Sequence, residues 1–67
     1  MKKMEEMTRE EMIQEVMSWE FDYAVDRIDA EKAVDEGIAD YEDDPEWYED
    51  YEDAISRHIH EILYPEV

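Results

Sequence analysis

The chain has 67 residues, of which 23 are Asp or Glu and six are Lys or Arg, so its formal net charge at neutral pH is −17. A chain this short forms one domain and buries only about 60% of its unfolded surface, which leaves little room for an enclosed active site. It has no Cys, which excludes disulfides and thiolate metal sites, and its charge opposes direct binding to nucleic acid or to an anionic membrane. We expect a basic protein surface as its partner.

The N-terminal residues 1–7 include two Lys but no apolar stretch of the length that a signal peptide or a membrane span requires. We therefore expect one cytoplasmic domain over residues 1–67, with residues 1–7 as a frayed extension. Leu, Ile, Val and Phe make up only 12 of the 67 residues, a composition typical of disorder. The large side chains nevertheless recur with a helical period, which favours a folded chain.

The first predicted helix covers residues 8–28 and begins with a capping box formed by Thr8 and Glu11. Its apolar side chains occupy a wide arc of the helix. They are Met12, Ile13, Val16, Met17, Trp19, Phe21, Tyr23, Ala24 and Ile28. One thin partner helix does not cover an arc of this width, so a symmetric homodimer would bury the surplus.

The second predicted helix covers residues 30–41, with Ala30, Ala33, Val34, Gly37, Ile38 and Tyr41 along one face. This stripe continues in phase with that of residues 8–28, so the sequence leaves open whether the two helices are one long, kinked helix. Gly37 costs about 1 kcal/mol relative to Ala inside a helix. Its place on the apolar face indicates either the close approach of a neighbour or a helix end.

The third predicted helix covers residues 45–64, because Asp44 is a good N-cap, Pro45 suits the first helical position and Pro65 ends the pattern. Its apolar positions follow a helical spacing. They are Trp47, Tyr48, Tyr51, Ala54, Ile55, Ile59, Ile62 and Leu63. No alternating pattern predicts a strand. The sequence thus predicts an all-α fold, a small bundle of three helices.

Residues 35–53 contain eleven acids and no base. On helices, this corresponds to about one negative charge per 2.6 Å, compared with about one per 1.7 Å in duplex DNA. Glu46, Glu49, Asp50 and Asp53 have the spacing that would place their carboxylates in one row on a helix. A solvated face that only aids solubility is the alternative, but solubility needs a net charge of magnitude about 2–8.

Aromatic residues are interleaved with these acids, and together they suit a surface rich in Arg, because carboxylates bind guanidinium groups and rings make cation–π contacts. We predict a partner-binding site formed by Asp40, Tyr41, Glu42, Asp43, Asp44, Glu46, Tyr48, Glu49, Asp50, Glu52 and Asp53. Trp47 and Tyr51 are predicted to belong to the core. The sequence leaves Tyr41 and Tyr48 undecided between core and interface.

Metal and catalytic motifs fit the chain poorly. The acids from Asp40 to Asp44 begin like a calcium loop, but Pro45 replaces the required Gly and Tyr51 the bidentate Glu. His58 and His60 are two residues apart, so on a helix they diverge by about 200° and cannot share a metal. His58 fits a satisfied histidine within the apolar stripe. We expect no metal, no cofactor and no enzymatic activity.

Small size, the charge of −17, the lack of Cys and the sequence DYEDDPEWYEDYED at residues 40–53 resemble the small acidic DNA-mimic inhibitors of phages and mobile elements. That class includes anti-CRISPR proteins, anti-restriction proteins and uracil-DNA glycosylase inhibitors. The resemblance implies a stoichiometric inhibitor that blocks the nucleic-acid-binding groove of a defence nuclease or regulator. It also implies a location in the host bacterial cytoplasm if a phage encodes the protein.

Two other functions remain open at this point. An antitoxin or anti-activator would use the same acids to neutralise a basic toxin or transcription factor. A helical oligomerisation module would instead use the wide apolar arc of residues 8–28, and its function would survive neutralisation of the acids.

Overall fold

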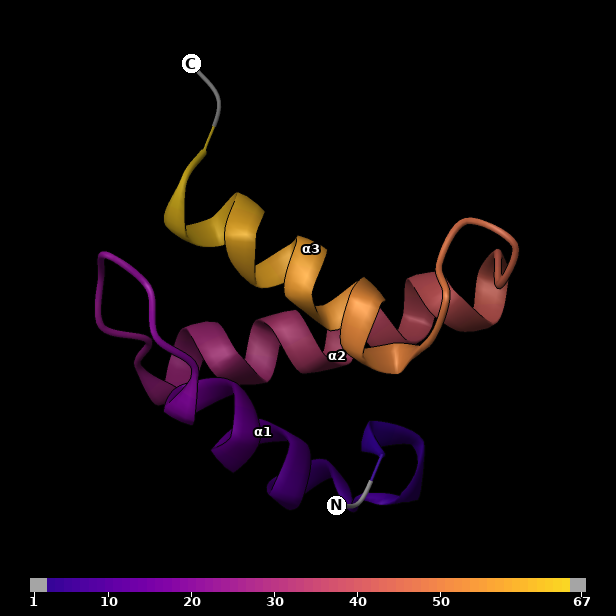
Figure 1. Ribbon diagram of the computed structural model, residues 1–67, viewed down its shortest axis with the longest axis horizontal. Coiled ribbons are helices and arrows are strands. Elements are labelled where there is room, and N and C mark those ends of the chain that lie inside the picture. Colours follow the sequence, from indigo (N-terminus) through magenta and orange to yellow (C-terminus); the bar gives the residue numbers. More distant parts are fainter. Residues whose placement is uncertain (1–2, 66–67) are drawn as a thin grey trace.

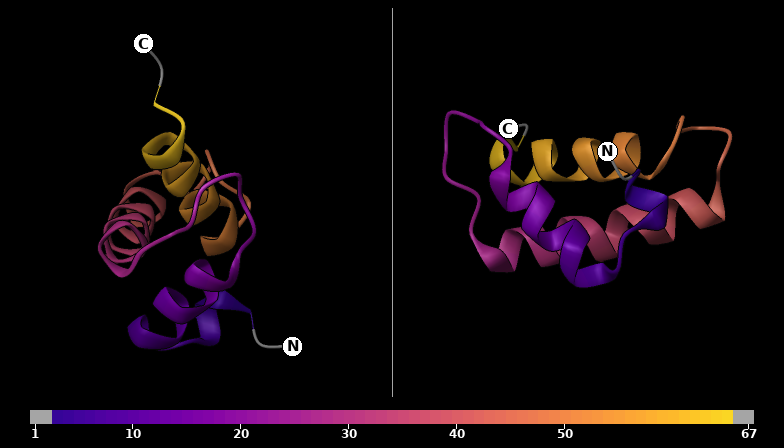
Figure 2. Two further views of the ribbon diagram at one scale, coloured as in Figure 1. Left: turned by 90° about the vertical axis from the view of Figure 1, so that its left-hand side faces the viewer. Right: turned by 60° about the horizontal axis from the view of Figure 1, so that its bottom comes forward.

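The computed structural model describes residues 3–65, and within them it contains helices and no strand (Figure 1). A 3-10 turn, η1, covers Met4–Glu6, and the α-helices are α1 (Arg9–Ser18), α2 (Arg27–Asp43) and α3 (Tyr51–Leu63). Helices α2 and α3 lie side by side, and α1 packs on this pair mainly through α2 (Figure 2). The predicted all-α fold of three helices is confirmed.

Helix α1 begins as predicted but ends early. Glu11 N donates to Thr8 Oγ1 at 3.2 Å and Thr8 N donates to Glu11 Oε1 at 2.9 Å, which completes the capping box. The helix ends at Ser18, so the predicted end at residue 28 is wrong, as is the alternative of one long kinked helix. Residues 20–26 alternate between acids or Ala and the large side chains of Phe21, Tyr23 and Val25. This period of two does not match a helix, and aromatic and β-branched residues favour the helix only weakly, so the chain leaves the helix and bends at Asp22 and Tyr23.

The connection between α1 and α2, residues 19–26, is attached to the rest of the domain. Trp19 and Phe21 are half-buried against the core, and Val25 is 9% exposed. Asp22 N donates a hydrogen bond of 3.0 Å to the hydroxyl of Tyr64, beyond the end of α3. The connection therefore has a fixed path rather than that of a loose loop.

Helix α2 begins earlier than predicted and continues through its glycine. Asp29 N donates to Asp26 Oδ1 at 2.9 Å, so Asp26 is the N-cap. Gly37 is buried where α2 crosses α3, and a Cβ atom placed on it would lie 2.8 Å from Cγ1 and 2.9 Å from Cα of Ile55. Gly37 thus permits a close helix crossing, and no helix ends there.

Helix α3 begins at Tyr51, so the predicted start at residue 45 is wrong. Asp53 N donates to Asp50 Oδ1 at 2.9 Å, which makes Asp50 the N-cap, while Trp47 N donates to Asp44 O at 3.2 Å and closes a turn around Pro45. Proline is favoured at the second position of such a turn. A helix from residue 45 would also have stacked four like charges on one side, which destabilises a helix.

The core lies between the three helices. Its buried apolar side chains are Met4, Met12, Ile13, Val16, Val25, Ala30, Ala33, Val34, Ala54, Ile55 and Ile59. Met4 is 3% exposed, and Lys3 N donates to Glu6 Oε2 at 3.2 Å, so the predicted fraying is wrong for residues 3–7, whereas residues 1–2 lie outside the described part. Burial of the long Met4 side chain, on a turn that packs against α3, stabilises this segment.

Candidate protein-binding interface

Three acids of α1 and of the first half of α2 pair with arginines within the molecule, namely Glu10, Glu31 and Asp35. Arg9 forms a bidentate pair with Asp35 at 2.8 and 2.9 Å, Arg27 Nη1 donates to Glu10 at 2.8 Å, and Glu31 lies 3.6 and 3.5 Å from the two arginines. The hydrogen bonds from Arg27 and Gln14 lower the pKa of Glu10 to about 2, and the hydrogen bond from Arg9 lowers the pKa of Asp35. Apart from Arg27 and Glu31, which both belong to α2, these exposed pairs link α1 to α2, each with a small contribution to stability.

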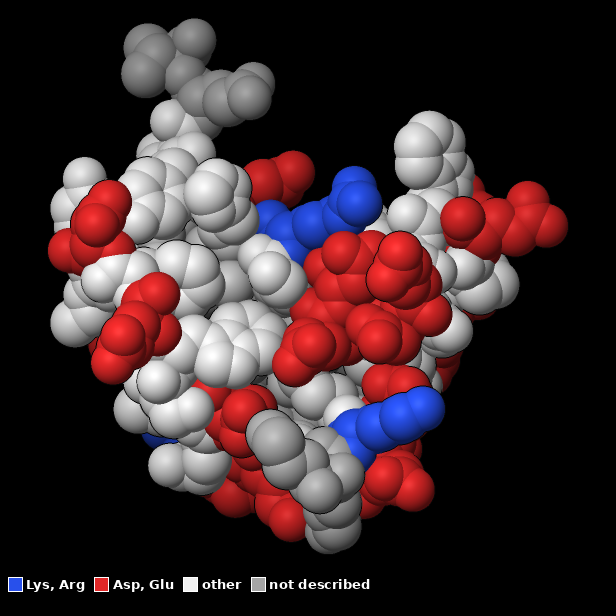
Figure 3. All heavy atoms as spheres, in the orientation of Figure 1, with Lys and Arg blue, Asp and Glu red and all other residues white. Residues whose placement is uncertain are grey.

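The acids from residue 40 to residue 53, which we call the acidic segment, have few basic partners. Two acids of this segment pair with a base among residues 3–65: Asp40, 2.5 Å from His58 Nε2, and Asp53, 3.3 Å from Arg57 Nε. The exposed carboxylates of the acidic segment without any partner in the described part of the chain are those of Glu42, Asp43, Asp44, Glu46, Glu49 and Glu52. Figure 3 shows acidic side chains gathered over the start of α3 and the connection that precedes it.

The acidic segment does not form the helical row that the sequence predicts. Glu46 and Glu49 lie in the connection between α2 and α3, Asp50 is the N-cap and only Asp53 lies inside α3. Asp53 Oδ2 also accepts a hydrogen bond of 3.2 Å from Glu49 N. The end of α2 at Asp43 and the late start of α3 thus spread the carboxylates over two helix ends and a turn, and two of the four stabilise the start of α3.

The aromatic residues of the acidic segment divide into two kinds. Tyr41 and Tyr51 are half-buried and pack edge to face, with ring centroids 5.0 Å apart, and Tyr51 contacts the core as predicted. Tyr48 is half-buried and its ring centroid lies 5.6 Å from the guanidinium carbon of Arg57. Trp47 is 72% exposed, so its assignment to the core is wrong. The turn around Pro45 directs Trp47 away from the core and makes it an interface candidate.

Two surface depressions combine these acids with aromatic rings. The α2-end hollow, of about 290 Å³, is lined by Asp40, Asp43, Asp44, Trp47 and Tyr48. The α3-start groove, of about 520 Å³, is lined by Trp19, Glu20, Phe21, Glu49, Asp50, Glu52, Asp53 and Ser56. The structure thus brings most of the predicted site residues to two depressions, whereas Tyr41, Glu42 and Glu46 line neither of them.

Sequence reasoning missed three residues of the α3-start groove, namely Trp19, Glu20 and Phe21. It placed them on a continuous helix, on which the aromatic residues belong to the apolar arc. The alternation of large and acidic residues from Glu20 to Asp26 departs from a helical period, and it is the signal against a continuous helix. The position of this segment beside α3 depends on tertiary contacts and is not visible in the sequence.

The described residues give no indication of a metal site or a membrane span. Within residues 3–65, no group of three or more His, Asp and Glu side chains is arranged to hold a metal ion. Each helix in this part of the chain is too short or too polar to cross a bilayer. His58 is 18% exposed and contacts Asp40, in keeping with its interpretation as a satisfied histidine. Comparisons with protein family models, curated proteins and solved structures give no match to this chain.

Proposed function

We propose that the protein is a stoichiometric inhibitor that presents its acidic segment to a basic nucleic-acid-binding groove of another protein. Phage anti-defence proteins, anti-CRISPR proteins among them, are the class of inhibitor that best fits. One observation carries the proposal: the exposed acids of residues 42–52 lack basic partners among the described residues, whereas Glu10, Glu31 and Asp35 of α1 and α2 pair with arginines. The arginines of the chain thus pair with acids between α1 and α2 and leave the carboxylates of residues 42–52 open to a partner.

An open acidic surface is costly for a domain of this size. Neighbouring carboxylates repel one another, and a net charge of −17 adds a general repulsion that opposes the compact state. A partner rich in Arg and Lys would relieve this repulsion on binding. Caps and turns already fix the acidic segment, so binding orders fewer groups than it would for a disordered acidic tail.

The acids form a patch rather than a line of phosphates. A basic groove recognises negative potential and hydrogen-bond acceptors, which a patch on two helix ends and a turn also provides. The inhibitor therefore imitates the charge of nucleic acid without its regular spacing. Long-range attraction speeds association with such a partner and makes it sensitive to salt.

Self-association is the less favoured function. The monomer itself buries Met12, Ile13 and Val16, which formed much of the apolar arc behind the homodimer prediction. Tyr23 and Ile28 remain exposed, so a homodimer stays a prediction. An antitoxin or anti-activator would use the same acidic segment, and the test below separates it from the favoured function by competition with DNA.

The test is affinity capture from lysates of phage-infected or CRISPR-bearing bacteria, followed by elution with duplex DNA. A basic nucleic-acid-binding protein should be captured and then released by DNA. A triple variant with Glu42→Gln, Glu46→Gln and Glu49→Gln should capture much less. Its control removes the same charge outside the acidic segment, with Asp22→Asn, Glu36→Gln and Glu61→Gln. Equal capture by the two variants, or a captured protein that DNA does not release, would contradict the proposal.

A further inference from the structure

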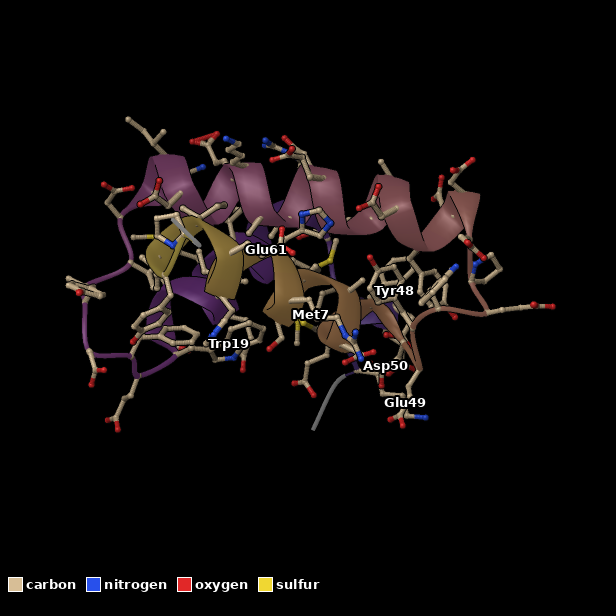
Figure 4. The ribbon with its side chains drawn as sticks, turned by 90° about the horizontal axis from the view of Figure 1, so that it is seen from above. Met7, Trp19, Tyr48, Glu49, Asp50 and Glu61 are labelled. Atoms are coloured by element: carbon tan, nitrogen blue, oxygen red, sulfur yellow. The ribbon has the colours of Figure 1, made fainter. Side chains whose placement is uncertain are left out.

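The α3-start groove has one aromatic wall and one acidic wall. Trp19 and Phe21 form the first, with ring centroids 6.5 Å apart in an edge-to-face arrangement. Glu49 and Glu52 belong to the second, and both are exposed without a side-chain partner among residues 3–65. Figure 4 shows Trp19 on the same side of the molecule as Glu49 and Asp50. The groove thus offers ring faces and free carboxylates to one ligand.

Both walls are held in place before any partner binds. Trp19 and Phe21 pack against the core, and the hydrogen bond from Asp22 N to Tyr64 fixes the connection that carries them. The acidic wall is fixed by the N-cap of α3, where Asp50 accepts from the backbone of Asp53. A preorganised groove loses less conformational entropy when a partner binds.

An arginine of the chain itself illustrates the chemistry that this surface accepts. Arg57 pairs with Asp53, which lines the α3-start groove, and lies over the ring of Tyr48, which lines the α2-end hollow. One guanidinium group therefore contacts a carboxylate and a ring of the acidic segment together. No basic side chain among residues 3–65 pairs with Glu49 or Glu52, so both carboxylates are open to a base from another molecule.

We propose that the α3-start groove binds an arginine side chain of the basic partner, an inference that rests on the proposed function. The guanidinium group is held by the carboxylates of Glu49 and Glu52 and stacks against Trp19 or Phe21. Arginine fits better than lysine because its planar group binds carboxylates in a bidentate manner and stacks on rings. The volume of about 520 Å³ falls within the range of side-chain and small-ligand sites.

The experiment compares two peptides of equal length and charge, one built with Arg and one with Lys. Trp47→Phe leaves Trp19 as the one tryptophan, so its fluorescence reports on the groove. The Arg peptide should change Trp19 emission and bind more tightly than the Lys peptide. Glu49→Gln with Glu52→Gln should weaken Arg-peptide binding about tenfold or more, as expected for lost charge-assisted hydrogen bonds. Glu36→Gln with Glu61→Gln removes the same charge at exposed positions outside the acidic segment and should weaken Arg-peptide binding about threefold at most.

Equal losses from the two double variants, or equal binding of the Arg and Lys peptides, would overturn the groove inference. Binding of the Arg peptide without a change in Trp19 emission would also overturn the groove inference. This fluorescence measurement needs no charge variant, so it does not depend on how those variants fold. After such results the inhibitor proposal would still hold, with the overall negative charge of the acidic segment as the basis of binding. That proposal fails separately if the unmodified protein does not displace duplex DNA from a basic DNA-binding protein.

Discussion

Replacement of Gly37 by Ala tests the close crossing of α2 and α3. Intrinsic helix propensity alone predicts stabilisation by about 1 kcal/mol. The new Cβ atom, however, would lie 2.8 Å from Cγ1 and 2.9 Å from Cα of Ile55. Rotation of the Ile55 side chain relieves only the first contact, because the second involves the backbone and requires α3 to move.

Overpacking of a tight core costs about 1–3 kcal/mol, occasionally more, and the backbone contact favours the upper part of this range. After subtraction of the propensity gain, we expect Gly37→Ala to lower the free energy of unfolding by about 1–2 kcal/mol. For a domain of this size, that corresponds to a fall in Tm of about 4–16 °C.

Thermal unfolding followed by circular dichroism measures this change. Ala39→Gly is the matched control, because Ala39 is exposed on the same helix and should lose only propensity, about 1 kcal/mol. If Gly37→Ala raises Tm by about as much as Ala39→Gly lowers it, the helices do not approach as closely as described.

Three further predictions concern charge. The Tm of the free protein should rise from low to moderate NaCl, because salt screens the repulsion among the acids. Partner binding should weaken over the same range, because salt also screens the attraction to a basic surface. A falling Tm would contradict the inferred repulsion. The hydrogen bond from Arg27 lowers the pKa of Glu10 from 4.5 to about 2, so its stabilisation is present above pH 4.5 and is lost as the pH falls towards 2. Glu10→Gln should therefore flatten the decline of Tm over this range, and a parallel decline would refute the pairing. Arg57→Gln frees Asp53 and should strengthen partner binding, measured by titration, more than Lys32→Gln does; equal gains would mean that only net charge matters.

Local chemistry made part of the fold predictable. The capping box at Thr8 and Glu11 and the apolar spacing of Ile55 and Ile59 depend on neighbouring residues, and both appear in the structure as predicted. The end of α1 was harder to predict from the sequence, because residues 19–26 fit both a helical pattern and an alternating one. The non-helical path includes contacts with the distant Tyr64, which a local sequence pattern does not reveal.

The composition of the candidate site was evident from the sequence, whereas its geometry was not. Asp44 and Asp50 are both good N-caps, and the choice of Asp50 moved the start of α3 by six residues from the predicted position. That shift changed a predicted row of carboxylates into a patch and exposed Trp47. The α3-start groove joins Trp19 to residues some thirty positions away in the chain, which only the packed fold brings together.

The most direct test of the central claim is a competition experiment in which this protein and labelled duplex DNA compete for the captured partner. Fluorescence anisotropy of the DNA monitors the competition. Inhibition in the basic groove predicts that one molecule of the protein displaces the DNA from one molecule of partner. It also predicts that the triple variant at Glu42, Glu46 and Glu49 needs a much higher concentration. A ternary complex, in which the partner holds the DNA and this protein at once, would contradict the claim.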